Sequence, residues 1–227
     1  MRYFALLFLL ISTLPACSHG SLLQPHSSRI QVIGDSTFAW NGGQMVRSMM
    51  FNLGIEVDDH SMSGAKITEE RLFARLLGPD ITAAANPLPR DWLVMTGGAN
   101  DLGGECGCTA CAGVLNDLIS PSGETGEIMD IILPALDLNT RVIYAVYYDA
   151  PRGGGPFSAC VPAFNELAAR INRAADRHEG LYVIDMGDAL DPDNPQDYDR
   201  DRIHPSPVAS VRIAKLITDV IMGVEGL

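Results

Sequence analysis

Three residues of this 227-residue chain have the types and spacing that nucleophilic catalysis requires. Ser36 ends a Gly-Asp-Ser segment, residues 34–36, where a sharp turn would expose its hydroxyl. Asp201 and His204 are three residues apart, so a single helical turn would place the carboxylate and the imidazole on one side. The carboxylate could then orient the imidazole, whose other nitrogen would take the serine proton. Considered singly, each segment is also compatible with an ordinary turn or a surface loop.

Two further segments could stabilise negative charge on a reacting carbonyl oxygen. Gly64 follows a serine, and a glycine there lets a backbone N–H approach the substrate. Asn100 lies in the sequence Gly-Gly-Ala-Asn-Asp at residues 97–101, and its side-chain amide can donate to the same oxygen. Alone, each is ordinary loop or turn chemistry. Taken together with the Ser36 and His204 segments, they become less compatible with ordinary loops.

Strands and helices alternate in an order that would bring these segments together. Strand-like runs occur at residues 30–33, 55–58, 92–95, 142–147 and 181–184. Helical patterns occur at residues 43–53, 68–78, 124–136, 162–178 and 208–222, and loops are expected at 79–89 and 185–207. This alternation predicts a parallel sheet covered on both faces. The chemical segments follow strand ends, which is where open α/β sheets place their sites.

In their order, the four segments resemble the sequence blocks of the SGNH hydrolases, also called GDSL esterases and lipases. The resemblance extends from about residue 30 to residue 213. The matching positions are residues 34–36, Gly64, residues 98–101 and residues 201–204. The chain departs from the family pattern at Thr37, where the family name has leucine, and in a cysteine-rich segment at residues 105–111.

The resemblance implies a three-layer α/β/α, flavodoxin-like fold with five parallel strands in the order 2-1-3-4-5. It implies Ser36 as the nucleophile, His204 as the general base and Asp201 as the partner of the histidine. The implied oxyanion hole consists of the N–H groups of Ser36 and Gly64 and the side-chain amide of Asn100. The implied reaction is cleavage of carboxylic esters through an acyl-enzyme, for which we expect no metal and no organic cofactor.

Four cysteines follow the N-terminal segment: Cys106, Cys108, Cys111 and Cys160. In an exported protein, disulfides are their expected state. A bridge between Cys106 and Cys108 would be strained, so we expect Cys160 to pair with one of these two and Cys111 with the other. The alternative is a four-cysteine zinc site, which export makes the weaker interpretation.

The first 17 residues have the pattern of an export signal. Arg2 precedes a nearly unbroken apolar run at residues 4–14, which is too short for a membrane-spanning helix. The run ends in Leu-Pro-Ala-Cys, which resembles a bacterial lipobox whose cysteine, Cys17, would carry lipid. The alternative is simple secretion with Cys17 as a spare thiol.

We therefore predict a signal peptide at residues 1–16, a polar tether at 17–28 and a single hydrolase domain at 29–227. The predicted location is the cell envelope, as an outer-membrane lipoprotein or in the periplasm. Ser18, directly after the cysteine, favours the outer membrane through the lipoprotein resemblance.

The composition limits the partners of the chain. Its formal net charge is −12 and 47% of its residues are hydrophobic, which excludes a disordered chain and argues against nucleic acid. We expect a small-molecule or glycan ester as substrate, with short acyl groups favoured, and membrane contact only through the N-terminal anchor. Two alternatives stay open: acyl transfer to a sugar or lipid hydroxyl, and an inert binding protein on the same scaffold.

Overall fold

The structure, a computed structural model, describes residues 29–67, 80–85 and 89–227. The predicted signal peptide, the tether and the helix predicted at 68–78 lie outside this part of the chain. No helix within the described part is long and apolar enough to cross a membrane.

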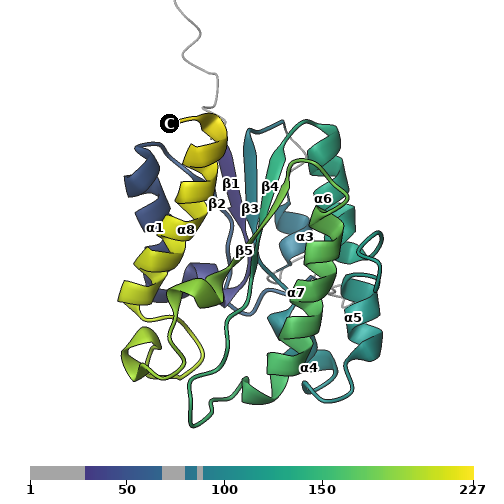
Figure 1. The fold of residues 1–227 in the computed structure, drawn as a ribbon, viewed down its shortest axis with the longest axis vertical. Coiled ribbons are helices and arrows are strands. Elements are labelled where there is room, and N and C mark those ends of the chain that lie inside the picture. Colours follow the sequence, from purple (N-terminus) through teal and green to yellow (C-terminus); the bar gives the residue numbers. More distant parts are fainter. Residues whose placement is uncertain (1–28, 68–79, 86–88) are drawn as a thin grey trace, which may run out of the picture.

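Five parallel strands form one sheet in the predicted order, β2-β1-β3-β4-β5. They are β1 (Ile30–Ile33), β2 (Asp58–Asp59), β3 (Trp92–Met95), β4 (Arg141–Val146) and β5 (Leu181–Asp185). Because all pairs are parallel, the carboxyl ends of the strands share one edge, at the bottom of Figure 1. The C-terminus of the chain lies at the opposite edge.

Helices cover both faces of the sheet, which confirms the three-layer prediction. Helices α1 and α8 pack on one face, and the other α-helices of the described residues pack on the opposite face (Figure 1). The α-helices are α1 (Ser36–Leu53), α3 (Ile81–Ala84), α4 (Ala99–Glu105), α5 (Ala112–Leu118), α6 (Glu127–Asp137), α7 (Val161–Ala175) and α8 (Pro207–Glu225). Short 3-10 helices are η1 (Ser158–Cys160), η2 (Met186–Ala189) and η3 (Pro195–Asp197).

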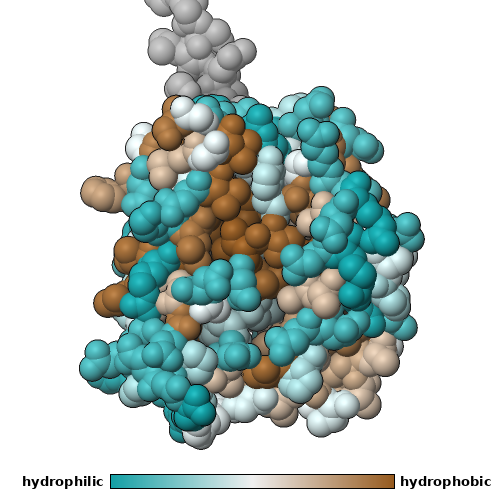
Figure 2. Space-filling view, viewed as in Figure 1, coloured by the Kyte–Doolittle hydropathy of each residue, from teal (hydrophilic) through white to brown (hydrophobic). Residues whose placement is uncertain are grey.

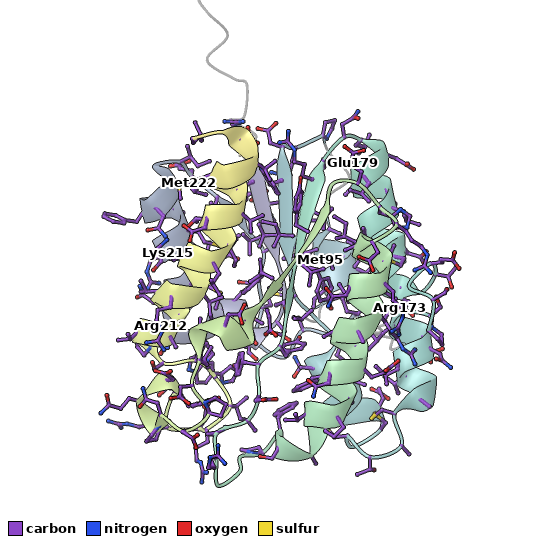
Figure 3. The ribbon with its side chains drawn as sticks, in the orientation of Figure 1. Met95, Arg173, Glu179, Arg212, Lys215 and Met222 are labelled. Atoms are coloured by element: carbon purple, nitrogen blue, oxygen red, sulfur yellow. A yellow bond between two sulfur atoms is a disulfide. The ribbon has the colours of Figure 1, made fainter. Side chains whose placement is uncertain are left out.

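Strand β3 shows why a central strand is hydrophobic throughout. Trp92 and Val94 pack in the cluster beneath α1 and α8, whereas Leu93 and Met95 pack in the cluster on the other face. All four side chains are buried, and Met95 lies in the middle of the molecule in Figure 3. A strand buried on both faces has no solvent side, so the polar alternation typical of a half-exposed strand is absent.

The second strand lies later in the chain than the sequence predicted. The prediction was residues 55–58, but only Asp58 and Asp59 pair, opposite Gln31 and Val32. Helix α1 ends in a left-handed Gly54, with a φ of 66°. The residues that follow carry the chain from this cap back to the edge of the sheet, so they are not part of the strand.

Several helix boundaries also differ from prediction. Helix α1 begins at Ser36 instead of residue 43, and it is interrupted because Asn41, Gly42 and Gly43 are left-handed. The sequence predicted no helix at α4 or α5 and a loop at α3. These three helices have at most seven residues, too few to show a clear helical period.

The view in Figure 2 divides into an apolar and a polar region. Hydrophobic residues gather between α7 and α8, where β5 forms the edge of the sheet. Hydrophilic residues cover the lower left, where Figure 1 places the loop after β5 and the start of α8. That polar region lies toward the carboxyl edge of the strands.

Candidate active site

Ser36 occupies the first position of α1, directly beyond the carboxyl end of β1. Asp35 precedes it and accepts the backbone N–H of Thr37 at 2.8 Å, which caps the helix. Gly34 makes the turn possible because a Cβ there would lie 2.9 Å from the side-chain methyl of Thr96. The sharp turn predicted from the Gly-Asp-Ser segment is therefore present, with Ser36 on the rim of the sheet.

His204 reaches Ser36 from the loop that precedes α8. Its Nε2 lies 2.7 Å from Ser36 Oγ, and its Nδ1 lies 2.6 Å from Asp201 Oδ2. The other oxygen of Asp201 accepts the backbone N–H groups of Ile203 and His204, at 2.9 and 3.1 Å. The structure thus brings together all three residues of the predicted triad, although Ser36 is 168 positions from His204.

The contacts of Asp201 define its charge and the tautomer of the histidine. Partial burial would raise the pKa of the Asp201 carboxyl, but the hydrogen bonds from His204 and Ile203 outweigh burial and lower that pKa below its ordinary value. An ionised Asp201 accepts the Nδ1 proton of His204. Nε2 is then left as an acceptor for the hydroxyl of Ser36.

Asn100 lies in the first turn of α4, beyond the carboxyl end of β3. Its side-chain amide donates to the carbonyl oxygen of Ala65 at 2.9 Å, which fixes the orientation of the amide plane. An amide nitrogen carries two protons, so one of them remains for a ligand. Asn100 and Ser36 line the same pocket, as the sequence predicted for an oxyanion site.

Gly64 lines the cavity next to this pocket. The segment before it runs beside β1, with the N–H of Met62 donating to the carbonyl of Gly34 at 2.9 Å. Gly64 itself is left-handed, with a φ of 79°, and lines a neighbouring open groove of about 410 Å³. That groove shares Asn100 with the Ser36 pocket, so the two cavities adjoin at Asn100.

The pocket around Ser36 is small and has a largely apolar wall. Its volume is about 130 Å³. The wall contains the aromatic or aliphatic side chains of Tyr147, Tyr148, Ala150, Phe157, Phe164 and Ile203. The polar lining includes the triad residues Ser36 and His204 and the amide of Asn100.

Tyr147 connects the turn of Ser36 with the turn of Asn100. Its hydroxyl donates to Asp35 Oδ2 and accepts the backbone N–H of Ala99, the latter at 3.2 Å. Burial raises the pKa of Asp35, against the hydrogen bonds from Tyr147 and Thr37, and burial also raises that of the Tyr147 hydroxyl.

Trp40 is a site residue that sequence reasoning missed. Its ring stacks on the imidazole of His204, with centroids 3.8 Å apart and planes 12° from parallel. Its Nε1–H donates to Asp199 Oδ2 at 2.7 Å. Trp40 therefore holds one face of the imidazole and connects the helix of Ser36 to the loop of His204. The one available signal was an aromatic residue four positions after the candidate nucleophile.

Two disulfides cross-link the segments that lie beside the site. Cys106 pairs with Cys111, and Cys108 pairs with Cys160, one of the two pairings that the sequence left open. The second bridge joins the segment after β3 to η1, which follows β4, and Cys108 lines the groove beside Asn100. With their sulfurs paired, these cysteines do not form the alternative zinc site.

The two disulfides should contribute unequally to stability. Replacing Cys108 and Cys160 by alanine removes a cross-link between residues 52 positions apart. Replacing Cys106 and Cys111 removes one between residues 5 positions apart. Loop-closure entropy gives about 4 kcal/mol for the long loop and about 2 kcal/mol for the short one. Denaturant unfolding of the two double variants without reductant measures the difference, and an equal or reversed order would contradict it.

The fold and these contacts together define a class of protein. A five-stranded parallel sheet in the order 2-1-3-4-5, covered on both sides by helices, is the SGNH-like α/β fold. Residues 32–209 match the GDSL-like lipase/acylhydrolase family, and the chain belongs to this family. The match includes all three triad residues, Ser36, Asp201 and His204.

Solved structures with similar folds include three bacterial proteins. A carbohydrate acetylesterase from Sinorhizobium meliloti is 15% identical, with 86% of this chain and 98% of that chain covered and a TM-score of 0.57. A family 3 carbohydrate esterase from Clostridium thermocellum is 16% identical, with 86% and 97% covered and a TM-score of 0.56. A GDSL-like lipase from Bacteroides thetaiotaomicron is 16% identical, with 86% and 88% covered and a TM-score of 0.58. No curated protein matches the chain in sequence.

Proposed function

We propose that this protein hydrolyses carboxylic esters with short acyl groups through an acyl-enzyme at Ser36. The observation that carries the proposal is the 2.7 Å contact between Ser36 Oγ and His204 Nε2. Asp201 supports it from the opposite side of the ring, at 2.6 Å from Nδ1. A hydroxyl, an imidazole and a carboxylate in this sequence of contacts form an activated nucleophile.

In the first half of the proposed reaction, Ser36 Oγ attacks the acyl carbon and His204 Nε2 takes the hydroxyl proton. The carbonyl oxygen becomes negative and accepts hydrogen bonds from the N–H of Ser36 and the amide of Asn100. Gly64 belongs to this set in the family pattern. The tetrahedral intermediate then expels the alcohol, which takes the proton from His204, and the acyl group stays on Ser36.

In the second half, water replaces the alcohol. His204 removes a proton from the water, the resulting hydroxide attacks the acyl carbon, and Ser36 leaves with the proton held by His204. Asp201 remains ionised throughout and stabilises the imidazolium. These steps use only side chains and backbone groups of this chain together with water.

The dimensions of the pocket support a short acyl group. A cavity of about 130 Å³ is smaller than the roughly 300–1,000 Å³ of sites that bury drug-sized ligands. Its wall of aromatic rings suits a methyl or ethyl group. Acetate esters of sugars are the first substrates to test, because two of the solved structures with similar folds are named carbohydrate acetylesterase or carbohydrate esterase.

The test combines a covalent probe with a substrate series. A fluorophosphonate should label Ser36, and p-nitrophenyl esters from acetate upward should show falling kcat/KM as the acyl chain lengthens. Failure to label would support the alternative of an inert binding protein. Formation of a new ester in the presence of a sugar or lipid alcohol, without free acid, would support acyl transfer.

We also propose that the protein is anchored by lipid at Cys17 in the cell envelope. The lipobox-like pattern supports the anchor, and two disulfides suit an oxidising compartment. Residue 29 precedes β1 and therefore lies at the edge of the sheet opposite to Ser36. An anchor before it would leave the site facing away from the membrane. Incorporation of labelled fatty acid into the wild type, and its absence from Cys17→Ala, tests the anchor.

Trp40 should affect turnover more than substrate binding. Trp40→Leu removes the ring that stacks on His204 and the hydrogen bond to Asp199. Because a misplaced base slows proton transfer, we expect kcat to fall roughly tenfold with little change in KM. Trp40→Phe keeps an aromatic face and should restore most of kcat. A rise in KM alone, or equal losses in both variants, would contradict this positioning role.

A further inference from the structure

Two arginines close to the catalytic histidine in the chain have guanidinium groups that are available to bind a ligand. Arg202 lies two residues before His204, and Arg200 lies four residues before it. Both are exposed. Within the described residues, neither guanidinium has an ion-pair or hydrogen-bond partner. In a chain with a net charge of −12, two free cationic groups at the site are a local exception.

Arg202 lies where two cavities adjoin. It lines the Ser36 pocket and also an open groove of about 720 Å³, which Arg200 lines as well. A Cβ placed on Gly153 would be 3.4 Å from Arg202 Nη2, so the guanidinium lies against the loop after β4. The backbone of Arg202 is left-handed, with a φ of 60°, and a Cβ on Gly155 would be 2.3 Å from its carbonyl oxygen. The loop therefore packs tightly on Arg202.

Nearby carboxylates are mostly engaged elsewhere. Asp193, in the same groove, forms an ion pair with Arg152. Asp199 accepts the indole N–H of Trp40 and the backbone N–H of Arg200. Asp201 accepts from His204. Asp35 and Asp149 both line the Ser36 pocket, and Asp35 accepts hydrogen bonds from Thr37 and Tyr147.

The mechanism of ester cleavage determines that the alcohol part of the substrate lies closest to Arg202. The departing alcohol oxygen takes its proton from His204 Nε2, so this oxygen must lie next to the imidazole. The carbonyl oxygen must lie on the other side, toward Asn100. Whatever is attached to the alcohol therefore leaves the pocket on the side of His204, where the Arg202 groove begins.

We propose that Arg202, with Arg200 beside it, binds an anionic group on the alcohol part of the ester. The substrate class is then an ester of an acidic alcohol, whose negative charge comes from a carboxylate or a phosphate. A planar guanidinium pairs with either group through two parallel hydrogen bonds. This inference rests on the proposed function, since it specifies the substrate of the same site.

Three acetate esters test the proposal: 4-acetoxybenzoate, 4-acetoxyphenyl phosphate and the neutral methyl 4-acetoxybenzoate. For each, the ratio of kcat/KM between variant and wild type cancels the reactivity of the leaving group. Arg202→Gln should lower kcat/KM about tenfold for the anionic esters and less than about twofold for the neutral ester. Arg200→Gln should give a smaller loss of the same kind.

Lys215→Gln is the matched control because it removes one positive charge from α8, away from the groove (Figure 3). It should leave all three rates unchanged. Loss on the carboxylate ester alone, or on the phosphate ester alone, identifies the anion and supports the proposal. Equal effects of Arg202→Gln on charged and neutral esters would overturn it. A wild type inactive on the neutral ester as well would overturn the proposed function itself.

Discussion

Ser36→Ala should lower kcat for ester hydrolysis by at least about 10³-fold, because loss of the nucleophile removes the covalent route. The alanine keeps the turn, since Asp35 still accepts the N–H of Thr37 and caps α1. The free energy of unfolding should therefore change by less than about 1 kcal/mol. Turnover of p-nitrophenyl acetate and denaturant unfolding measure the two quantities in the same preparation.

Ser61→Ala is the matched control for that experiment. Ser61 follows β2 in the chain, and its hydroxyl bonds to Asp59 at 2.7 Å, so its replacement removes a hydroxyl without touching Ser36. It should retain full activity and should still be labelled by a fluorophosphonate. If Ser36→Ala kept more than about a tenth of the wild-type kcat, Ser36 would not be the nucleophile.

Asn100→Ala should give the second-largest loss, roughly 10²–10³-fold in kcat with a smaller change in KM. The amide contributes most when negative charge has developed on the carbonyl oxygen, so its removal raises the barrier more than it weakens substrate binding. Steady-state kinetics on p-nitrophenyl acetate, under conditions where acylation limits the rate, measure this split.

A structural effect of the same substitution must be separated from the catalytic one. Asn100 also donates to Ala65, so alanine removes a hydrogen bond that orders the loop. Asn52→Ala removes a comparable side-chain hydrogen bond, to Thr218, on the α1–α8 face. Both variants should lose similar stability, but only Asn100→Ala should lose turnover. An unchanged kcat in Asn100→Ala would exclude its amide from the oxyanion hole.

The parts of the fold that the sequence predicted well are those with long, consistent patterns. Strand β3 is hydrophobic at every position, and its range, Trp92–Met95, was predicted without error. The left-handed run at Asn41, Gly42 and Gly43 has a sequence cause as well, since asparagine and glycine tolerate positive φ best. Strand β2 was predicted too early in the chain, at residues 55–58, because two paired residues contain no periodicity that could fix their position.

The site residues also fall into two groups, those that a local motif identifies and those that only the folded chain reveals. Ser36, Asn100, Asp201 and His204 were identified because each lies in a short motif of characteristic residue types. Trp40 was not identified, because its role depends on stacking against the ring of His204, 164 positions away in the chain. No local motif marks that contact. Tyr147 was not assigned for the same reason, since its partners Asp35 and Ala99 follow two other strands, β1 and β3. Contacts between distant segments require the folded chain.

The hydroxyl of Tyr147 has a consequence for redesign of this scaffold. Because a residue at the end of β4 joins Asp35 to Ala99, the spacing between the nucleophile and the amide is set by three adjacent strands. The segments at 103–111 and 151–156 line the outer grooves and carry none of these bonds. Substitutions in the 103–111 segment that keep both disulfides should therefore change which esters are accepted while the reacting groups keep their distances. The 151–156 segment must keep its glycines, because it packs on Arg202 next to Asp201.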